Sequence, residues 1–239
     1  MSELSNYIDT LRTKYPFLNF KIHDVVESTL NENYGVINII HITNTSPESR
    51  EPLIVIPGYS FKSFTGMTNV LLEGSIASDK YNIHVINWGD RVKELSIDVS
   101  KDLESEEEKY KANDVFRMKM ANILDKILRS EDMGFTQDGT NISLLGKSAG
   151  GGVALYIAKV NHYVNKLFLC APSTNTNGTL VEDRKDLEIK LSWNKDDNTI
   201  PYEKHKDFII DFENQHNRYT LYLYETGGHE LNSEFVKEL

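Results

Sequence analysis

Residues 142–152 read ISLLGKSAGGG, the most informative stretch of the chain. Three of its first four residues are apolar, as in a strand that is buried on both faces of a sheet. The segment Ala149–Val160 that follows is predicted to be a helix. Gly146, Ser148 and Gly150 at the junction form a Gly-x-Ser-x-Gly motif, in which the serine occupies a strained turn. Because the helix begins at the serine, its free N–H groups and dipole favour an anion there.

Two other interpretations of this junction compete. Gly146-Lys147-Ser148 is also the ending of a phosphate-binding loop, Gly-x-x-x-x-Gly-Lys-Ser/Thr. That loop requires a glycine at position 141, where the chain has Asn141, and an open loop before the lysine, where the chain has a strand. The nucleotide interpretation therefore fails on both counts. The remaining alternative is a glycine-rich turn with an ordinary surface serine.

Strand-like and helix-like segments alternate outward from this junction. A helix at Ser2–Lys14 and a hairpin, with its turn at 31–33, are predicted first. The predicted strands are Phe20–Ser28, Gly35–Thr43, Leu53–Ile56, Ile83–Asn87, Ile142–Leu145, Leu167–Ala171, a run ending at Trp193, and Tyr219–Tyr224. The other predicted helices are Phe64–Ser78, Lys111–Arg129, Ala149–Val160, Tyr202–His216 and Leu231–Leu239. This order predicts an α/β fold in one domain over 1–239, with a mostly parallel eight-stranded sheet that follows an antiparallel pair.

Composition excludes several classes of protein. The 239 residues carry a formal charge of −10, which argues against binding of nucleic acid or an anionic membrane and gives a mild bias against strongly anionic substrates. The sequence contains neither an apolar run of about 18 residues nor a secretory leader, so we expect no membrane insertion. One cysteine, Cys170, cannot form an intramolecular disulfide, so a reducing, cytoplasmic location is expected. Cys170 itself is predicted to be a buried structural thiol.

A serine nucleophile needs a base, usually a histidine that a carboxylate orients. Among seven histidines, His229 stands out because it follows the last predicted strand and two glycines. The other six fall within strands or beside helices, where structural roles are expected. The loop after Trp193 offers two candidate acids, Asp196 and Asp197. The order Ser, Asp, His at successive strand ends is typical of one fold.

On these motifs the whole chain resembles the α/β-hydrolase family, as a small member without a cap. In that family the acid usually lies four residues before a proline, which favours Asp197, with Pro201 behind it, over Asp196. Asn194 departs from the glycine that is common three residues before the acid. The resemblance implies that the backbone N–H groups of Tyr59, after strand Leu53–Ile56, and Ala149 form an oxyanion hole.

The resemblance implies a serine hydrolase that acts on a carboxylic ester or thioester through Ser148, Asp197 and His229. A peptidase, an acyltransferase or a non-catalytic binding protein on the same fold is the alternative, because fold does not select chemistry. We expect a small-molecule or acyl substrate, no cofactor and no metal. The segment Pro172–Asp186 is too short for a multi-helix lid, so an open cleft is expected. Its possible walls are Tyr59, Phe61 and the loop Pro172–Leu180. The segment Arg91–Glu108 is the other candidate to cover the site, and its many charges predict that it is solvated or mobile.

Overall fold

The structure, a computed structural model, describes most of the chain. The described residues are 2–26, 35–45, 50–73, 76–130, 133, 135, 141–174, 178–216 and 218–239. The predicted hairpin turn at 31–33 lies outside them. Across the described ranges, the helices are too short or too polar to traverse a lipid bilayer.

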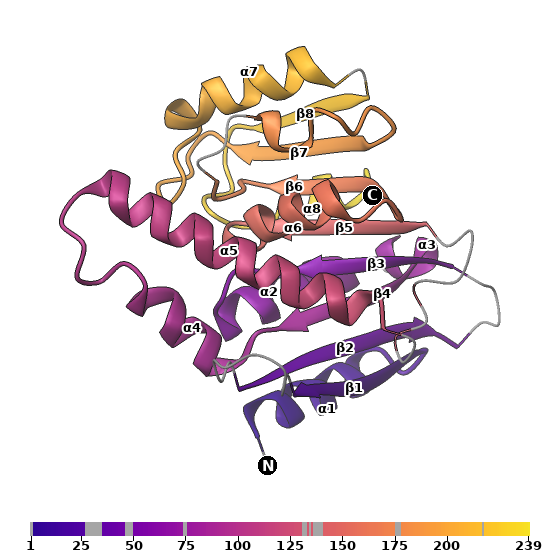
Figure 1. The fold of residues 1–239 in the computed structure, drawn as a ribbon. Helices are drawn as coiled ribbons and strands as arrows, with labels where there is room; N and C mark the ends of the chain where they lie inside the picture. Colours follow the sequence, from indigo (N-terminus) through magenta and orange to yellow (C-terminus); the bar gives the residue numbers. More distant parts are fainter. Residues whose placement is uncertain are drawn as a thin grey trace.

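One eight-stranded sheet forms the centre of the protein (Figure 1). Its strands are β1 (Leu18–Val26), β2 (Val36–Asn44), β3 (Glu51–Ile56), β4 (Tyr81–Asn87), β5 (Ile142–Lys147), β6 (Val164–Cys170), β7 (Glu188–Asn194) and β8 (Tyr219–Tyr224). Their order across the sheet is β1-β2-β4-β3-β5-β6-β7-β8. Only β2 pairs antiparallel, with β1 on one side and β4 on the other; the remaining pairs are parallel. The predicted α/β fold with an N-terminal antiparallel pair is therefore confirmed.

Helices cover both faces of this sheet (Figure 1). The described helices are α1 (Glu3–Lys14), α2 (Phe61–Leu72), α3 (Ile76–Lys80), α4 (Gly89–Asp98), α5 (Glu106–Leu128), α6 (Ala149–Val160), α7 (Lys206–Gln215) and α8 (Ser233–Val236), with the 3₁₀ turns η3 (Gly178–Val181) and η4 (Tyr202–His205). Residues of α4, α5, α6 and α7 pack in one apolar core, and those of α1, α2, α3 and α8 pack in the other.

Alternation along the strands divides the side chains between the two cores. In β3, Ile54 and Ile56 belong to the core under α5 and α6, whereas Leu53 and Val55 belong to the opposite core. All four side chains are fully buried. This is the apolar pattern that a parallel strand covered on both faces requires.

Several helices differ in extent from the prediction. The single helix expected over Phe64–Ser78 is two helices, α2 and α3, and the one expected over Tyr202–His216 begins with the 3₁₀ turn η4. Helix α5 begins at Glu106, five residues before the predicted start, because Ser105 caps it: the Ser105 hydroxyl accepts from the Glu108 N–H at 3.2 Å. The helix expected over Leu231–Leu239 is the single turn α8.

Helix α4 is an unpredicted element. We expected the charged segment Arg91–Glu108 to be solvated or mobile, but Gly89–Asp98 forms a helix that leaves the carboxyl end of β4. Its Val92 is fully buried in the core. The α4–α5 hairpin projects beyond the carboxyl ends of the strands in Figure 1. It therefore lies on the side of the sheet where the candidate site forms.

Candidate active site

Ser148 occupies the turn between β5 and α6, and its backbone is strained. Its φ of 55° and ψ of −126° lie in a region that residues with a side chain rarely adopt. The flanking glycines allow the turn: a Cβ on Gly146 would lie 2.7 Å from the Gly150 carbonyl oxygen. A Cβ on Gly150 would lie 2.0 Å from the carbonyl oxygen of Ile56, at the end of β3. The turn thus exposes Ser148 at the central strand and packs closely against the neighbouring one.

Asp197 and His229 meet between the ends of β7 and β8. Nδ1 of His229 donates a hydrogen bond to Oδ2 of Asp197 at 2.7 Å. The other carboxylate oxygen accepts from the N–H groups of Thr199, at 2.8 Å, and Ile200, at 2.9 Å. Asp197 is only 2 % exposed. These bonds fix the carboxylate and, through it, the tautomer in which Nε2 of His229 is unprotonated and can accept a proton.

Asp196 has a different set of contacts. Its carboxylate oxygens accept from the N–H groups of Gly228, at 2.7 Å, and Gly227, at 3.3 Å. Both glycines have positive φ values, 57° for Gly228 and 144° for Gly227. Asp196 therefore holds the backbone of the loop that carries His229, whereas Asp197 contacts the imidazole itself.

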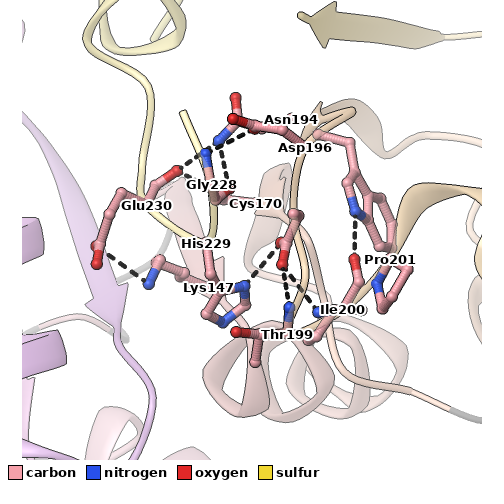
Figure 2. Close-up of polar contacts among 12 residues, drawn as sticks. Lys147, Cys170, Asn194, Asp196, Thr199, Ile200, Pro201, Gly228, His229 and Glu230 are labelled. Carbon is pink, nitrogen blue, oxygen red and sulfur yellow. Dashed lines mark hydrogen bonds and ion pairs between the residues drawn. The ribbon is translucent and has the colours of Figure 1, made fainter. Parts of the chain in front are cut away.

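Asn194 fastens the same loop from the end of β7. Its side-chain amide donates to the carbonyl of Gly228 at 2.9 Å and to that of Glu230 at 3.0 Å, on either side of His229 (Figure 2). A Cβ on Gly227 would lie 2.7 Å from the Asn194 side chain, so this glycine lets the loop approach. The asparagine that departs from the family pattern thus joins the acid loop to the base loop. In the sequence, this role is indicated only by the unusual presence of an asparagine three residues before Asp197.

A cleft of about 470 Å³ brings Ser148 and His229 together. The described residues that line it are Gly58, Tyr59, Ser60, Lys62, Ser63, Lys93, Ile97, Lys147, Ser148, Ala149, Thr199, His229 and Glu230. None of the other six histidines, all within the described ranges, lines this cleft. In the described part of the chain, the Ser148 hydroxyl forms no hydrogen bond with His229, although both residues line the same cleft.

Some of the predicted walls differ. Tyr59 lines the cleft, but Phe61 lines a separate cavity of about 210 Å³ beside the N-terminus of α1. The described residues of the loop Pro172–Leu180 are not among the cleft residues, and 175–177 lie outside the described part. Lys93 and Ile97 of α4, which belong to the candidate segment Arg91–Glu108, line the cleft. Tyr59 and part of this charged segment therefore line the site, and that part of the segment is an α-helix.

The two predicted oxyanion-hole donors, the N–H groups of Tyr59 and Ala149, belong to residues that line the cleft. Within the described residues, neither N–H group has a backbone or side-chain acceptor. The N–H of the preceding Gly58 is held by the hydroxyl of Ser63 at 3.0 Å, which fixes this turn. A Cβ on Gly58 would lie 3.8 Å from the Cβ of Ser148, so the turn adjoins the serine.

Lys147, next to the serine, is the unusual member of the motif. Its side chain is only 4 % exposed, yet it lines the cleft. Its ammonium lies 3.5 Å from the carboxylate of Glu230, whose side chain is 61 % exposed (Figure 2). Within the described residues, this nearly buried cation therefore has one ionic partner, which is itself solvated.

Cys170, at the end of β6, is buried as predicted. Burial raises the pKa of its thiol to about 11. Its Sγ lies 3.8 Å from the carbonyl oxygen of Glu230, a weak contact. Within the described ranges, no group of three or more His, Cys, Asp and Glu side chains is placed to hold a metal ion.

The comparisons with known proteins establish the class of fold. Neither a protein-family model nor a curated protein sequence matches the chain. A predicted CIB-like hydrolase from Thermoplasma acidophilum is similar in structure, with a TM-score of 0.59, 16 % identity and coverage of 92 % of this chain and 96 % of that one. The Pyrococcus furiosus esterase Pf2001 is also similar in structure, with a TM-score of 0.60, 11 % identity and coverage of 91 % of this chain and 86 % of that one.

A putative dienelactone hydrolase from Klebsiella pneumoniae is a third similar structure, with a TM-score of 0.55, 10 % identity and coverage of 91 % of this chain and 90 % of that one. At these identities the similarity concerns the fold. The protein has the α/β-hydrolase fold, and the described part of the chain forms no large cap over the carboxyl end of the sheet.

Proposed function

We propose that the protein is a serine hydrolase that cleaves a carboxylic ester or thioester, with Ser148, Asp197 and His229 as its catalytic triad. The observation that carries this proposal is the 2.7 Å hydrogen bond between Asp197 and His229 at the cleft where Ser148 sits on its strained turn. Each group comes from the end of a different strand. The hydrolase and esterase names of the similar structures support the same class of reaction.

In the first half of the reaction, Oγ of Ser148 attacks the carbonyl carbon of the ester. Nε2 of His229 accepts the hydroxyl proton and then gives it to the departing alcohol or thiol. Asp197 stabilises the imidazolium that forms in between. The acyl group remains on Ser148 as an ester. Water then attacks this ester by the same route, releases the acid and restores the free hydroxyl.

The oxyanion of each tetrahedral intermediate is assigned to the N–H groups of Tyr59 and Ala149. Each donor is worth about 3 kcal/mol of barrier when it is aimed at the developing charge. The Ala149 N–H belongs to the first turn of α6, where the helix dipole adds to its effect. The Ser63 hydroxyl, which holds the N–H of Gly58, acts as a positioning group for the other donor.

Labelling with a fluorophosphonate probe tests this proposal, because the activated serine displaces fluoride and becomes phosphonylated. Wild type should label, and the variants Ser148→Ala and His229→Ala should not. Ser60→Ala is the matched control, because Ser60 lines the same cleft but caps α2. Absence of labelling in folded wild type, or equal labelling in Ser148→Ala, would overturn the proposal. A series of 4-nitrophenyl esters then establishes whether labelled enzyme also turns over.

A further inference from the structure

The charge of the cleft is opposite to that of the protein. The chain carries a formal charge of −10. Among the described residues that line the cleft, however, the fixed charges are three ammonium groups, of Lys62, Lys93 and Lys147, and one carboxylate, of Glu230. The remaining titratable side chains there are His229 and Tyr59. An excess of two positive charges therefore surrounds the scissile position.

Lys62 and Lys93 are the cations that are free to bind a ligand. Within the described residues, neither ammonium forms an ion pair or a hydrogen bond, whereas the ammonium of Lys109 on α5 pairs with Glu106 at 2.9 Å. Lys62 comes from the first turn of α2 and Lys93 from α4, so they face the cleft from two different elements. The N-terminus of α2 adds its positive dipole on the same side.

Lys147 is the third cation among the described residues that line the cleft. Its side chain is nearly buried, and in the described part of the chain its one ionic contact is the 3.5 Å approach to Glu230. Because the Glu230 side chain is mostly exposed, solvent screens this pair. A ligand anion within the cleft would thus meet three cations and one partly screened carboxylate.

We propose that the protein selects esters that carry an anionic group, such as a carboxylate, which Lys62 and Lys93 bind while Ser148 attacks the ester. This inference rests on the proposed function and names its substrate class. The overall negative charge predicts a bias against anionic substrates, but the local charges of the cleft act at much shorter range. Interactions beyond about 8–10 Å are largely screened at physiological salt, so the lysines dominate at the site.

Matched substrates test the inference. For the acyl side, the pair is 4-nitrophenyl pentanoate and the 4-nitrophenyl monoester of glutaric acid, which differ mainly by a terminal carboxylate. For the leaving-group side, the pair is phenyl acetate and 4-acetoxybenzoate. The quantity measured is the anionic-to-neutral ratio of kcat/KM, compared between wild type and each variant. Intrinsic reactivity cancels in that comparison, and the pair whose ratio changes identifies the end that bears the charge.

In the double variant Lys62→Gln/Lys93→Gln, the ratio for one pair should fall about tenfold, the effect of two exposed ion pairs together. The kcat/KM for neutral esters should stay within twofold. Glu230→Gln should raise the same ratio about threefold, because it removes the only carboxylate among the described lining residues. Higher salt should weaken the wild-type preference.

The matched control is Lys126→Gln/Lys159→Gln, which removes two positive charges elsewhere. These lysines lie in the last turns of α5 and α6. Helix α6 rises about 1.5 Å per residue away from Ser148, which places Lys159 roughly 16 Å along its axis. The control should leave both ratios unchanged. An unchanged ratio in the Lys62/Lys93 double variant, or an equal fall in the control, overturns the inference.

A binding measurement separates this inference from the proposed function. The mono-anilide of glutaric acid and 4-acetamidobenzoate keep the carboxylate on the acyl side and on the leaving-group side, respectively, but replace the ester with a stable amide. For at least one of the two amides, calorimetry should show at least fivefold weaker binding to Lys62→Gln/Lys93→Gln than to wild type. If folded wild type fails to label with fluorophosphonate yet shows this difference, the hydrolase proposal fails and anion recognition stands. If it labels but the two proteins bind both amides equally, anion recognition fails.

Discussion

Asp196 and Asp197 are adjacent in the sequence, yet their carboxylates hold different parts of the His229 loop. Asp197 accepts from Nδ1 of the imidazole at 2.7 Å, and Asp196 accepts from the backbone N–H of Gly228 at the same distance. One carboxylate orients the side chain, and the other supports the peptide that carries it. The two aspartates therefore form a matched pair for mutagenesis, because each variant loses one negative charge on the same loop.

Asp197→Asn should lower kcat for ester hydrolysis by about 10³–10⁴-fold, because an amide can present the wrong partner to Nδ1 and favour the wrong tautomer. Asp196→Asn should lower kcat by less than about tenfold, since His229 keeps its contact with Asp197. Steady-state kinetics on a 4-nitrophenyl ester measure both effects. Equal losses in the two variants would contradict the separate roles assigned here.

The glycines of the site should differ sharply in their tolerance of a methyl group. In Gly150→Ala the new Cβ would overlap the backbone oxygen of Ile56, 2.0 Å away, which no rotamer change can relieve. We expect a loss of about 3 kcal/mol or more in the free energy of unfolding. Gly228→Ala meets no atom within 4 Å and adds only the strain of its positive φ, about 1 kcal/mol. Urea denaturation distinguishes the two, and similar losses would argue against this packing at Gly150.

The histidine pair on β2 and β4 should make stability depend on pH. Nδ1 of His41 lies 2.8 Å from Nδ1 of His84, so one ring donates to the other. Burial, followed by nearby positive charges, lowers the pKa of His41 to about 4, and burial lowers that of His84 to about 3. In the unfolded chain both titrate near about 6.5. Below that pH the unfolded chain binds protons that the folded protein does not. The free energy of unfolding therefore falls as the pH drops toward 4.

Between pH 7.5 and pH 5.0, the buried His84 alone should contribute a loss on the order of 2 kcal/mol in the free energy of unfolding. The double variant His41→Gln/His84→Gln should lose this part of the pH dependence, whatever its absolute stability. Urea titrations at the two pH values give the comparison. A variant whose stability falls as steeply as that of wild type would show that the pair does not titrate in this way.

The thiol of Cys170 should be inert in the folded protein. With its pKa raised to about 11 by burial, it is almost entirely protonated at pH 8. Reaction with a disulfide reagent should therefore be about 100-fold or more slower than for a free cysteine, and one thiol per chain should appear at once in denaturant. Ester hydrolysis should survive the treatment. Rapid reaction of the native protein would place the thiol in a more accessible or more polar environment.

The architecture could largely be predicted from the sequence because its signals are local. The run ISLLG predicts a buried strand, and the glycines that follow predict the strained turn that Ser148 adopts, with φ at 55°. Helix α6 has the predicted bounds, Ala149–Val160, since its apolar positions continue directly from the motif. The strand Tyr219–Tyr224 also has its predicted bounds. In each case the residues that predict the element are neighbours in the sequence.

Other features could not be predicted because they depend on residues that are distant in sequence. The charge density of Arg91–Glu108 predicts a solvated segment. The first residues of this segment instead belong to helix α4, because Val92 packs in the apolar core. Asn194 departs from the glycine of the family pattern, and its role depends on the carbonyl groups of Gly228 and Glu230, which accept hydrogen bonds from its side chain. The ion pair of Lys147 likewise depends on the loop that brings the carboxylate of Glu230 within 3.5 Å of it.

The bonds from Asn194 and Asp196 to the His229 loop have a consequence for how the site responds to a substrate. Two loops that follow different strands are joined by four side-chain-to-backbone hydrogen bonds, so the acid and the base form one preassembled body. The ordering entropy of these loops is lost when the chain folds and not when the substrate arrives. A substrate therefore meets an Asp197–His229 pair whose relative position is already set when the chain folds.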